Sequence, residues 1–190
     1  GHMEEVKVKG KASYYIPHHC VIREGSLTTK HRVVFDASMI TSKNGISLNS
    51  TLYTGPKLQA DIVEIILRFR THRIALTADI CKMFRQILIR PQDRKYQHIL
   101  WRKNENEPVK EYELCTVTYG TSSAPYLANR SIIQLNIDEG DNFPEVTQIL
   151  DKDIYVDDIL TGGDTIKEVV GYRDCLSQIL KKGGFELKKW

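Results

Sequence analysis

The sequence lacks several features that would assign it to a common structural class. Its four cysteines are widely scattered and contain no Cys-x-x-Cys pair, so neither a disulfide framework nor a zinc ribbon is indicated. There is no secretory signal and no apolar run near the ~20 residues that a membrane helix needs. Internal repeats and low-complexity tracts are also missing. These absences predict an intracellular globular protein with reduced thiols.

The composition allows a hydrophobic core, and the charge is unevenly distributed. Hydrophobic residues make up 41% of the 190 residues, which suits one globular domain or one domain with a lobe. Ten Lys and Arg residues stand against two acids between Arg68 and Lys103, whereas eight acids stand against Lys152 alone between Asp138 and Asp158. This pattern suits a protein that grips a polyanion beside a divalent metal. Uneven charge on a solvated surface remains the alternative.

Periodicity predicts an α+β fold with an antiparallel, ferredoxin-like sheet and helices on one face. We expect helices at residues 58–70, 123–139 and 143–150, and another from Asp164 or Thr165 to Lys182. Strands are expected at 14–22, 32–36, 74–79, 86–90, 96–102, 110–119 and 185–190, with a hairpin at 154–161. Residues 23–31 and 42–56 are predicted to be loops.

Two adjacent acids lie inside an apolar hairpin, where Asp157 and Asp158 follow Ile154-Tyr155-Val156. Neighbouring residues on a regular strand point to opposite faces, so both acids can serve one site only near a tight turn. Like charges repel unless a cation neutralises them, and Mg²⁺ prefers carboxylate oxygens. Asp79, at the end of another apolar strand, is the candidate third ligand. A solvated pair of turn acids is the alternative.

Five ordered segments resemble the motifs of reverse transcriptases. They are Arg32-Val33-Val34-Phe35-Asp36-Ala37-Ser38, the run from Ala78 to Ile87, the run from Tyr119 to Pro125, Tyr155-Val156-Asp157-Asp158 and the run from Gly183 to Lys189. Four further runs resemble in particular the Pao/BEL group of LTR retrotransposons, namely residues 14–19, 67–70, 118–121 and 160–164. The resemblance covers nearly the whole chain after Gly1-His2-Met3, which is typical of a tag remnant.

The resemblance implies a right-hand polymerase palm with a fingers subdomain and no thumb. Residues 4–190 would form this fingers–palm domain, with fingers at roughly 4–72 and 91–118 and palm at roughly 73–90 and 119–190. The implied setting is the cytoplasm, in the virus-like particle of a retroelement. The implied partners are an RNA or DNA template–primer, dNTPs, and the thumb and RNase H regions of a longer polyprotein.

The implied activity is RNA-directed DNA synthesis with two Mg²⁺ ions, which Mn²⁺ can replace. The catalytic metal ligands would be Asp79, Asp157 and Asp158, together with the backbone carbonyl of Ile80. The resemblance further assigns residues to the dNTP, namely Lys30, Arg32, Phe84, Tyr119 and Gly120. It assigns Gln86, Tyr155 and Pro125 to the template–primer, and Lys188 or Lys189 as the general acid for pyrophosphate.

Structural alternatives stay open for most of these residues. Arg32 would otherwise form a salt bridge with Asp36. Phe84 and Tyr155 would be core residues. Gln86, Lys188 and Lys189 would be solvated surface residues. Phe84 is expected to exclude the ribose 2′-hydroxyl sterically.

A thumbless chain is expected to be weakly active, because duplex binding needs many phosphate contacts. The alternative function is a non-catalytic reverse-transcriptase-like module for binding or assembly. A zinc site at His18-His19-Cys20 is not favoured, because contiguous ligands lack the usual spacing.

Overall fold

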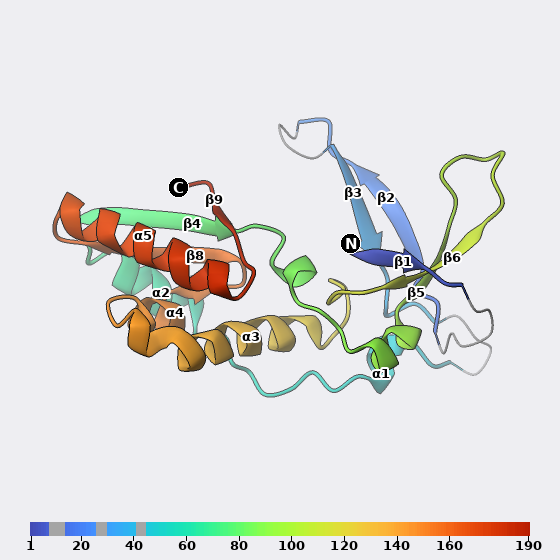
Figure 1. Cartoon of the computed structure of the whole chain (residues 1–190), viewed down its shortest axis with the longest axis horizontal. Helices are drawn as coiled ribbons and strands as arrows, with labels where there is room; N and C mark the ends of the chain where they lie inside the picture. Colours follow the sequence, from blue (N-terminus) through green and yellow to red (C-terminus); the bar gives the residue numbers. More distant parts are fainter. Residues whose placement is uncertain (8–13, 26–29, 41–44) are drawn as a thin grey trace. The chain divides into compact units, whose positions relative to one another are not determined.

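The computed structural model describes residues 1–7, 14–25, 30–40 and 45–190. Parts of the predicted loops at 23–31 and 42–56 therefore lie outside the described residues. The chain forms two compact units, each built from two segments (Figure 1). The first unit contains Gly1–Gly55 and Ile87–Ala124, and the second contains Pro56–Gln86 and Pro125–Trp190. The predicted domain limits near residues 72 and 90 differ from these divisions.

The first unit consists of small antiparallel sheets around one apolar cluster. Strands β1 (Met3–Glu5), β6 (Lys110–Leu114) and β5 (His98–Trp101) form a sheet in that order, and β2 (His18–Ile22) pairs with β3 (His31–Phe35). The short helix α1 (Leu48–Thr51) begins at Ser47, whose side chain accepts from the Ser50 amide. Ile16, Ala37, Leu48, Ile99 and Leu114 form the buried cluster. Burial of these side chains stabilises the unit.

The second unit is built on a four-stranded antiparallel sheet in the order β7-β8-β4-β9. Its strands are β7 (Ile154–Tyr155), β8 (Asp158–Gly163), β4 (Ile74–Ile80) and β9 (Leu187–Lys188). In β4 the residues Ala78 and Ile80 are buried, whereas Ala75 and Thr77 between the covered positions are exposed. One face of β4 is therefore covered and the other is open, as expected for an antiparallel sheet packed on one side.

Helices cover the sheet of the second unit. Helix α5 (Ile166–Lys182) packs on β4 and β8, α2 (Ile62–Phe69) on β8 and β7, and α4 (Thr147–Lys152) on β7 (Figure 1). The long helix α3 (Ala124–Glu139) continues into η3 (Gly140–Asn142), and two further 3₁₀ helices are η1 (Met83–Gln86) and η2 (Pro91–Tyr96). No helix among the described residues is both long and apolar enough to cross a membrane.

Helix α2 is fastened to the base of the β7–β8 hairpin by a polar network. The Arg68 Nε donates to Asp153 Oδ1 at 3.0 Å, and the buried Thr161 hydroxyl donates to Asp153 Oδ2 at 3.0 Å. Arg68 also donates to the Lys152 carbonyl. Because Asp153 is buried, these partners satisfy a carboxylate that would otherwise be costly to desolvate.

Several expectations for the secondary structure were wrong. The strand expected at 14–22 is limited to His18–Ile22, and the strand expected at 110–119 ends at Leu114. The helix expected at 58–70 begins only at Ile62, because Asp61 caps it. No strand forms at 86–90: η1 and the Pro91-led η2 flank this run, and only a single bridge joins Leu88 to Thr116. The expected loop at 42–56 contains α1, because Ser47 and Ser50 cap each other reciprocally. The helix expected at 143–150 begins later, at Thr147. The last strand stops at Lys188, because Lys189 adopts a φ of 59°.

Helix α5 begins with a local network centred on Glu168. Thr165 is the N-cap, and its hydroxyl accepts from the Glu168 amide at 3.2 Å. The Glu168 carboxylate accepts from the Asp164 amide at 3.0 Å and from the Tyr172 hydroxyl at 2.7 Å. These bonds lower the pKa of Glu168, the Tyr172 bond most strongly. The sequence pattern had left Asp164 and Thr165 as equal candidates for the cap, and the structure selects Thr165.

Removing Glu168 should make the free energy of unfolding depend less on pH in the acidic range. A lowered carboxyl pKa stabilises the fold above the unfolded-state pKa, and this contribution is lost as pH falls through the folded-state pKa. We therefore expect Glu168→Ala to lower the urea midpoint at neutral pH. The difference from wild type should disappear well below the ordinary glutamate pKa of about 4.3. Urea titrations followed by circular dichroism measure this. The exposed Glu145→Ala is the control, and a midpoint difference that is constant with pH would contradict the expectation.

Candidate active site

The register of β4 against β8 brings two predicted metal ligands together. Asp79 lies directly opposite Asp158 across this antiparallel pair, and directly opposite Lys188 of β9 on the other side. Residues paired across strands project from the same face of a sheet. The side chains of Asp79, Asp158 and Lys188 therefore lie on one face. This is also the face of Ala75 and Thr77, which is open in β4.

The third acid, Asp157, lies in the turn of the β7–β8 hairpin. The turn is made possible by Val156, which adopts a φ of 57°. A β-branched residue in this left-handed region is strained, by about 1–3 kcal/mol. The turn is held from the β4 side, since the Ile80 amide donates to the Asp157 carbonyl at 2.6 Å. Ile80 itself is fully buried.

The three carboxylates form a negatively charged cluster that is only partly neutralised. The pKa of Asp158 is raised, mainly by desolvation and then by repulsion from Asp157 and Asp79, although the residue as a whole is exposed. Lys189 opposes this shift, and its Nζ lies 2.7 Å from Asp79 Oδ1. The cluster is thus an arrangement of oxygen donors in which added positive charge is favourable.

The two candidate lysines have different partners. The Lys189 ammonium pairs with Asp79, and this bond raises its pKa. The Lys188 ammonium instead pairs with Glu186 at 3.2 Å, which raises its pKa as well. Both side chains hold their protons at neutral pH. Of the two, Lys189 is the one in contact with the candidate metal ligands.

Gln59 is a site residue that sequence reasoning missed. Its Nε2 donates to the Ile154 carbonyl at 2.7 Å, and its Oε1 accepts from the Val156 amide at 2.9 Å. The side chain thus contacts the backbone on both sides of Tyr155. It comes from the segment just before α2, whose N-cap is Asp61. No local pattern marks a glutamine in such a segment, because its partners are more than ninety residues away.

The remaining predicted residues of the second unit are partly buried or exposed. Phe84 and Gln86 lie in η1 and are half-buried, and the Gln86 amide donates to the Cys81 carbonyl at 3.5 Å. Tyr155 is half-buried in β7, and Pro125 is exposed in the first turn of α3. Phe84 is therefore not a fully buried core residue, whereas its neighbour Met83 is.

In the first unit, the predicted dNTP-binding residues belong to β3 and to the loop after β6. Lys30 and Arg32 are exposed, and Asp36 accepts from the Ser38 amide rather than pairing with Arg32 in the described part of the chain. The Tyr119 hydroxyl donates to the Val33 carbonyl at 2.7 Å, next to Arg32. Tyr119 is thereby tied to the strand that carries Arg32.

Gly120 occupies a position that only glycine fits. Its φ is 95°, and a Cβ there would lie 2.3 Å from the Phe35 carbonyl oxygen. Asn49, which sequence reasoning also missed, holds this loop. Its Nδ2 donates to the Gly120 carbonyl at 3.0 Å and its Oδ1 accepts from the Ser122 amide at 2.7 Å.

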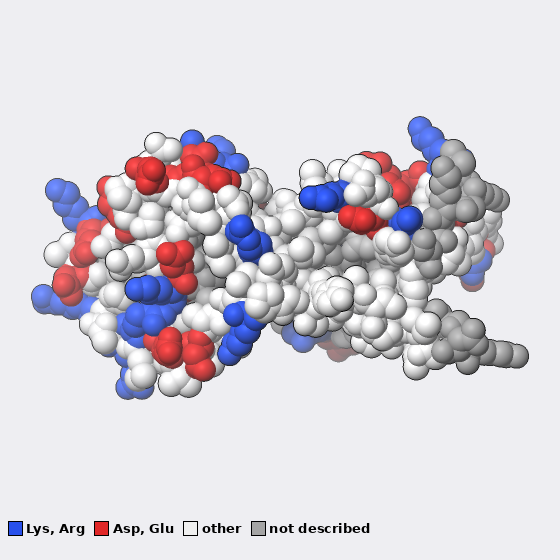
Figure 2. Space-filling view, turned by 90° about the horizontal axis from the view of Figure 1, so that it is seen from below, with Lys and Arg blue, Asp and Glu red and all other residues white. Residues whose placement is uncertain are grey.

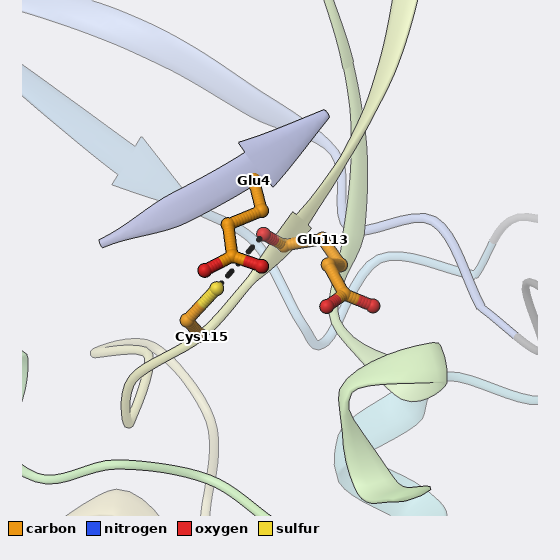
Figure 3. Close-up of side chains that lie close together, drawn as sticks. All are labelled: Glu4, Glu113 and Cys115. Carbon is orange, nitrogen blue, oxygen red and sulfur yellow. Dashed lines mark hydrogen bonds between the residues drawn. The ribbon is translucent and has the colours of Figure 1, made fainter. Parts of the chain in front are cut away.

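A second group of possible metal ligands lies in the first unit. Glu4, Glu113 and Cys115 are the only three such side chains, among the residues that the structure describes, whose ligand atoms all lie within 4.8 Å of one another (Figure 3). Arg94 already neutralises both carboxylates, at 3.8 Å from Glu4 and 3.3 Å from Glu113. Burial raises the pKa of the Cys115 thiol, which donates to the Glu113 carbonyl. A protonated thiol and an arginine make this a poor cation site.

A hard divalent cation is suited better by the cluster of Asp79, Asp157 and Asp158 than by the group of Glu4, Glu113 and Cys115. The aspartate cluster offers carboxylate oxygens, the donors that Mg²⁺ and Mn²⁺ prefer, and repulsion among them favours a cation. Within the cluster, the exposed Lys189 ammonium pairs with Asp79. The three carboxylates are not as close together as the Glu4 group.

Comparisons with known proteins identify the fold. No protein-family model matches the sequence, and no curated protein matches it. Among solved structures, the chain is similar to a mutant prototype foamy virus protease–reverse transcriptase, with a TM-score of 0.73 and 19% identity. It is also similar to a foamy viral protease–reverse transcriptase in complex with double-stranded DNA (0.74 and 16%) and to the native prototype foamy virus protein (0.69 and 18%). The fold is reverse-transcriptase-like.

Each of these matches covers 98% of this chain but only a small part of the solved protein. The chain spans 21% of the two prototype foamy virus chains and 28% of the chain in the DNA complex. At these identities the likeness concerns the fold.

Replacing Lys189 should tighten binding of a divalent cation. In Lys189→Met the ammonium that lies 2.7 Å from Asp79 is lost, so a cation no longer competes with it for the carboxylate. We expect the Kd for Mn²⁺ to fall by roughly two- to fivefold, as for the loss of one exposed ion pair. Titration followed by electron paramagnetic resonance measures free Mn²⁺. The matched control is Lys188→Met, which removes the ion pair with Glu186 instead; equal Kd values in the two variants would argue against the competition.

Proposed function

We propose that the chain is the core of an RNA-directed DNA polymerase, which adds dNTPs to a primer 3′ end on an RNA or DNA template. The observation that carries this proposal is the pairing of Asp79 with Asp158, beside Asp157 in a strained turn, within a reverse-transcriptase-like fold. Nucleotidyl transfer by two metal ions requires clustered carboxylates of this kind.

The proposed roles of the acids follow from their chemistry. Asp79, Asp157 and Asp158 would hold two Mg²⁺ ions, which Mn²⁺ can replace, with the Ile80 carbonyl as a further oxygen ligand. When bound, these ions supply charge stabilisation for the attacking 3′-oxygen and the leaving pyrophosphate. The protein's part is to fix the acids in place through the β4–β8 register and the hairpin turn.

Lys189 is the better candidate for the general acid. Its raised pKa keeps it protonated at neutral pH, and its contact with Asp79 keeps the ammonium beside the acids. Donation of its proton to pyrophosphate would compensate the charge that develops as the bond between the α-phosphorus and the bridging oxygen breaks. Lys188, which pairs with Glu186, would remain a surface residue.

The first unit would supply residues for the nucleotide and the template. Arg32 suits triphosphate oxygens because its planar donors bind them in pairs, and Lys30 would add a second charge. Tyr119 and Gly120 would line the pocket of the nascent base pair, where the absence of a side chain at Gly120 permits close approach. In the second unit, Gln86, Tyr155 and Pro125 are proposed to contact the template–primer.

The basic run between Arg68 and Lys103 contributes fewer candidates for phosphate contacts than its sequence suggests. Arg68 is engaged by Asp153, and Arg94 by Glu113 and Glu4. On the face drawn in Figure 2, basic and acidic side chains intermingle over the second unit. Nucleic-acid binding through the remaining cations should therefore be modest and strongly dependent on salt.

We further propose a Pao/BEL-type retroelement as the source, acting in the cytoplasm within a virus-like particle. This rests on the motifs quoted above and not on the fold. Because the chain spans 21–28% of the solved chains it matches, complete activity and partners such as a thumb or an RNase H domain would belong to a longer protein. Synthesis by this chain alone should be weak.

Primer extension tests the polymerase directly. On a ribohomopolymer template at low salt with Mg²⁺ or Mn²⁺, we expect measurable extension by the wild type. Asp157→Asn combined with Asp158→Asn should reduce it by at least about a hundredfold, since charge stabilisation of this kind is typically worth that much. The control is Asp141→Asn, which changes an exposed acid of the same unit.

The outcomes separate the polymerase from the alternative, a non-catalytic binding or assembly module. Loss of extension in the double variant, but not in the control, supports the polymerase. Extension that survives in the double variant assigns the synthesis to other residues. If neither protein extends a primer, the same assay on a chain lengthened by a thumb decides, and its failure would leave the non-catalytic module.

Phe84 is expected to decide between deoxy- and ribonucleotides. A ring beneath the sugar clashes with a 2′-hydroxyl, so Phe84→Val should increase the relative kcat/KM for rNTPs by about tenfold or more. Single-nucleotide extension with matched dNTP and rNTP measures the ratio. Met83→Leu is the control, since Met83 is buried in the core. If the ratio of kcat/KM for rNTP and dNTP is unchanged in Phe84→Val, Phe84 only packs against its neighbours.

A further inference from the structure

The edge of the β7–β8 hairpin exposes two backbone groups that need partners. β7 is the outer strand of its sheet and has only two residues. The Leu160 amide donates to the Asp153 carbonyl at 2.9 Å, so the Asp153 carbonyl points towards β8. Bonded and non-bonded pairs alternate in an antiparallel ladder. The Ile154 carbonyl and the Val156 amide must therefore point away from β8, towards the edge.

Gln59 binds both of these groups with one side chain. Its Nε2 is 2.7 Å from the Ile154 oxygen, and its Oε1 is 2.9 Å from the Val156 nitrogen. A parallel neighbouring strand would satisfy the same two groups through the amide and carbonyl of one residue. The planar side-chain amide of Gln59 therefore takes the place of one residue of a fifth strand.

The bonds fall at the strained part of the hairpin. Val156, whose φ is 57°, follows the β7 residue that Gln59 spans. On the opposite side of the turn, the Ile80 amide binds the Asp157 carbonyl. The backbone of Val156 and Asp157 is thus held from both sides: by the Gln59 side chain at the outer edge and by the main chain of β4 at the inner edge.

The position of Gln59 is held by its burial and by the start of α2. It is half-buried and precedes Asp61, whose carboxylate accepts from the Val63 amide at 2.8 Å and begins α2. At the other end of α2, Arg68 binds Asp153 at the base of the same hairpin. The α2 segment therefore contacts the hairpin both near its turn and at its base, so its position and that of the turn are coupled.

We propose that Gln59 is a positioning residue, whose side-chain amide holds Val156 in its left-handed conformation and thereby fixes the direction of the Asp157 and Asp158 carboxylates. The proposal rests on the proposed function for its consequence, metal binding by these acids. The two hydrogen bonds of Gln59 with the Ile154 carbonyl and the Val156 amide are independent of that function. Gln59 touches neither substrate nor metal in this scheme and acts only through the backbone of the turn.

The test replaces Gln59 by residues of similar length. Gln59→Met removes both hydrogen bonds, whereas Gln59→Glu keeps the acceptor for the Val156 amide and loses the donor to Ile154. We expect amide hydrogen exchange at Val156, measured by NMR, to accelerate by roughly five- to tenfold in Gln59→Met, and by less in Gln59→Glu. Gln148→Met, an exposed glutamine of α4, is the matched control and should leave this rate unchanged.

The second readout is the Kd for Mn²⁺, with thermal unfolding measured in parallel. We expect the Kd to rise by roughly three- to tenfold in Gln59→Met, as for loss of an outer partner of a metal ligand, and the Tm to stay close to that of the control. Faster exchange with an unchanged Kd would overturn the positioning role. An unchanged rate of amide hydrogen exchange at Val156 would show that the two hydrogen bonds of Gln59 do not hold the turn. If Gln59→Met does not fold, Gln59→Glu is judged by the same two criteria.

Failure of the proposed function would look different from failure of this inference. A wild-type chain that binds no Mn²⁺, and whose double Asp157→Asn and Asp158→Asn variant behaves identically, argues against the polymerase. In that case the direction of the two acids is read from the NMR chemical shifts of the Asp157 and Asp158 amides. Shifts that stay unchanged in Gln59→Met would overturn the positioning role even without a metal.

Discussion

The register between β4 and β8 is the constraint on which the second unit depends. It places Asp79 opposite Asp158, and a slip of one residue would turn every β8 side chain to the other face of the sheet. The far end of the same ladder fixes this register. Gly162 pairs with Ala75, and a Cβ on Gly162 would lie 2.3 Å from the Ile74 carbonyl oxygen and 2.6 Å from the His72 side chain. Close packing at one end of the strands thus determines which acids meet at the other.

The two units hold their site loops by a similar device. In the second unit a glutamine amide binds the backbone on both sides of Tyr155, and in the first unit the Asn49 amide binds the Gly120 carbonyl and the Ser122 amide. A side-chain amide can do this because it carries both a donor and an acceptor in one plane. Irregular backbone, which has no ladder partner of its own, is thereby satisfied without a further strand.

The sequence predicted the parts of the fold that local patterns encode. The apolar stripe of α2, Pro125 in the first turn of α3, the α5 helix ending at Gly183, and the hairpin around Asp157 all follow from spacing within a few residues. Asp79 was a candidate third ligand from its place at the end of an apolar strand and from the motif resemblance, whereas its pairing with Asp158 comes from the structure. Of the three acids, Asp79 and Asp158 lie on the open face of the sheet.

The parts that could not be predicted depend on partners distant in the sequence. Gln59 was expected inside the helix at 58–70, but α2 begins only at Ile62, and the role of Gln59 appears only when Val156, 97 residues away, is beside it. The ion pair of Lys189 with Asp79 accompanies a positive φ at Lys189, which no local sequence pattern marks. The absence of the strand expected at 86–90 reflects the 3₁₀ helices on both sides. Propensity is a weak guide when tertiary context competes with it.

The local start of α5 has a consequence for the order in which the second unit folds. The contacts among Asp164, Thr165, Glu168 and Tyr172, like those of the β7–β8 hairpin, join residues only a few positions apart. The contacts of β4 with β8 and of Gln59 with Val156 close loops of roughly eighty to a hundred residues, and such closures are slow. We therefore expect the helix and the hairpin to form early in folding and β4 to dock late. Asp79 would then join the other two acids only at that late step.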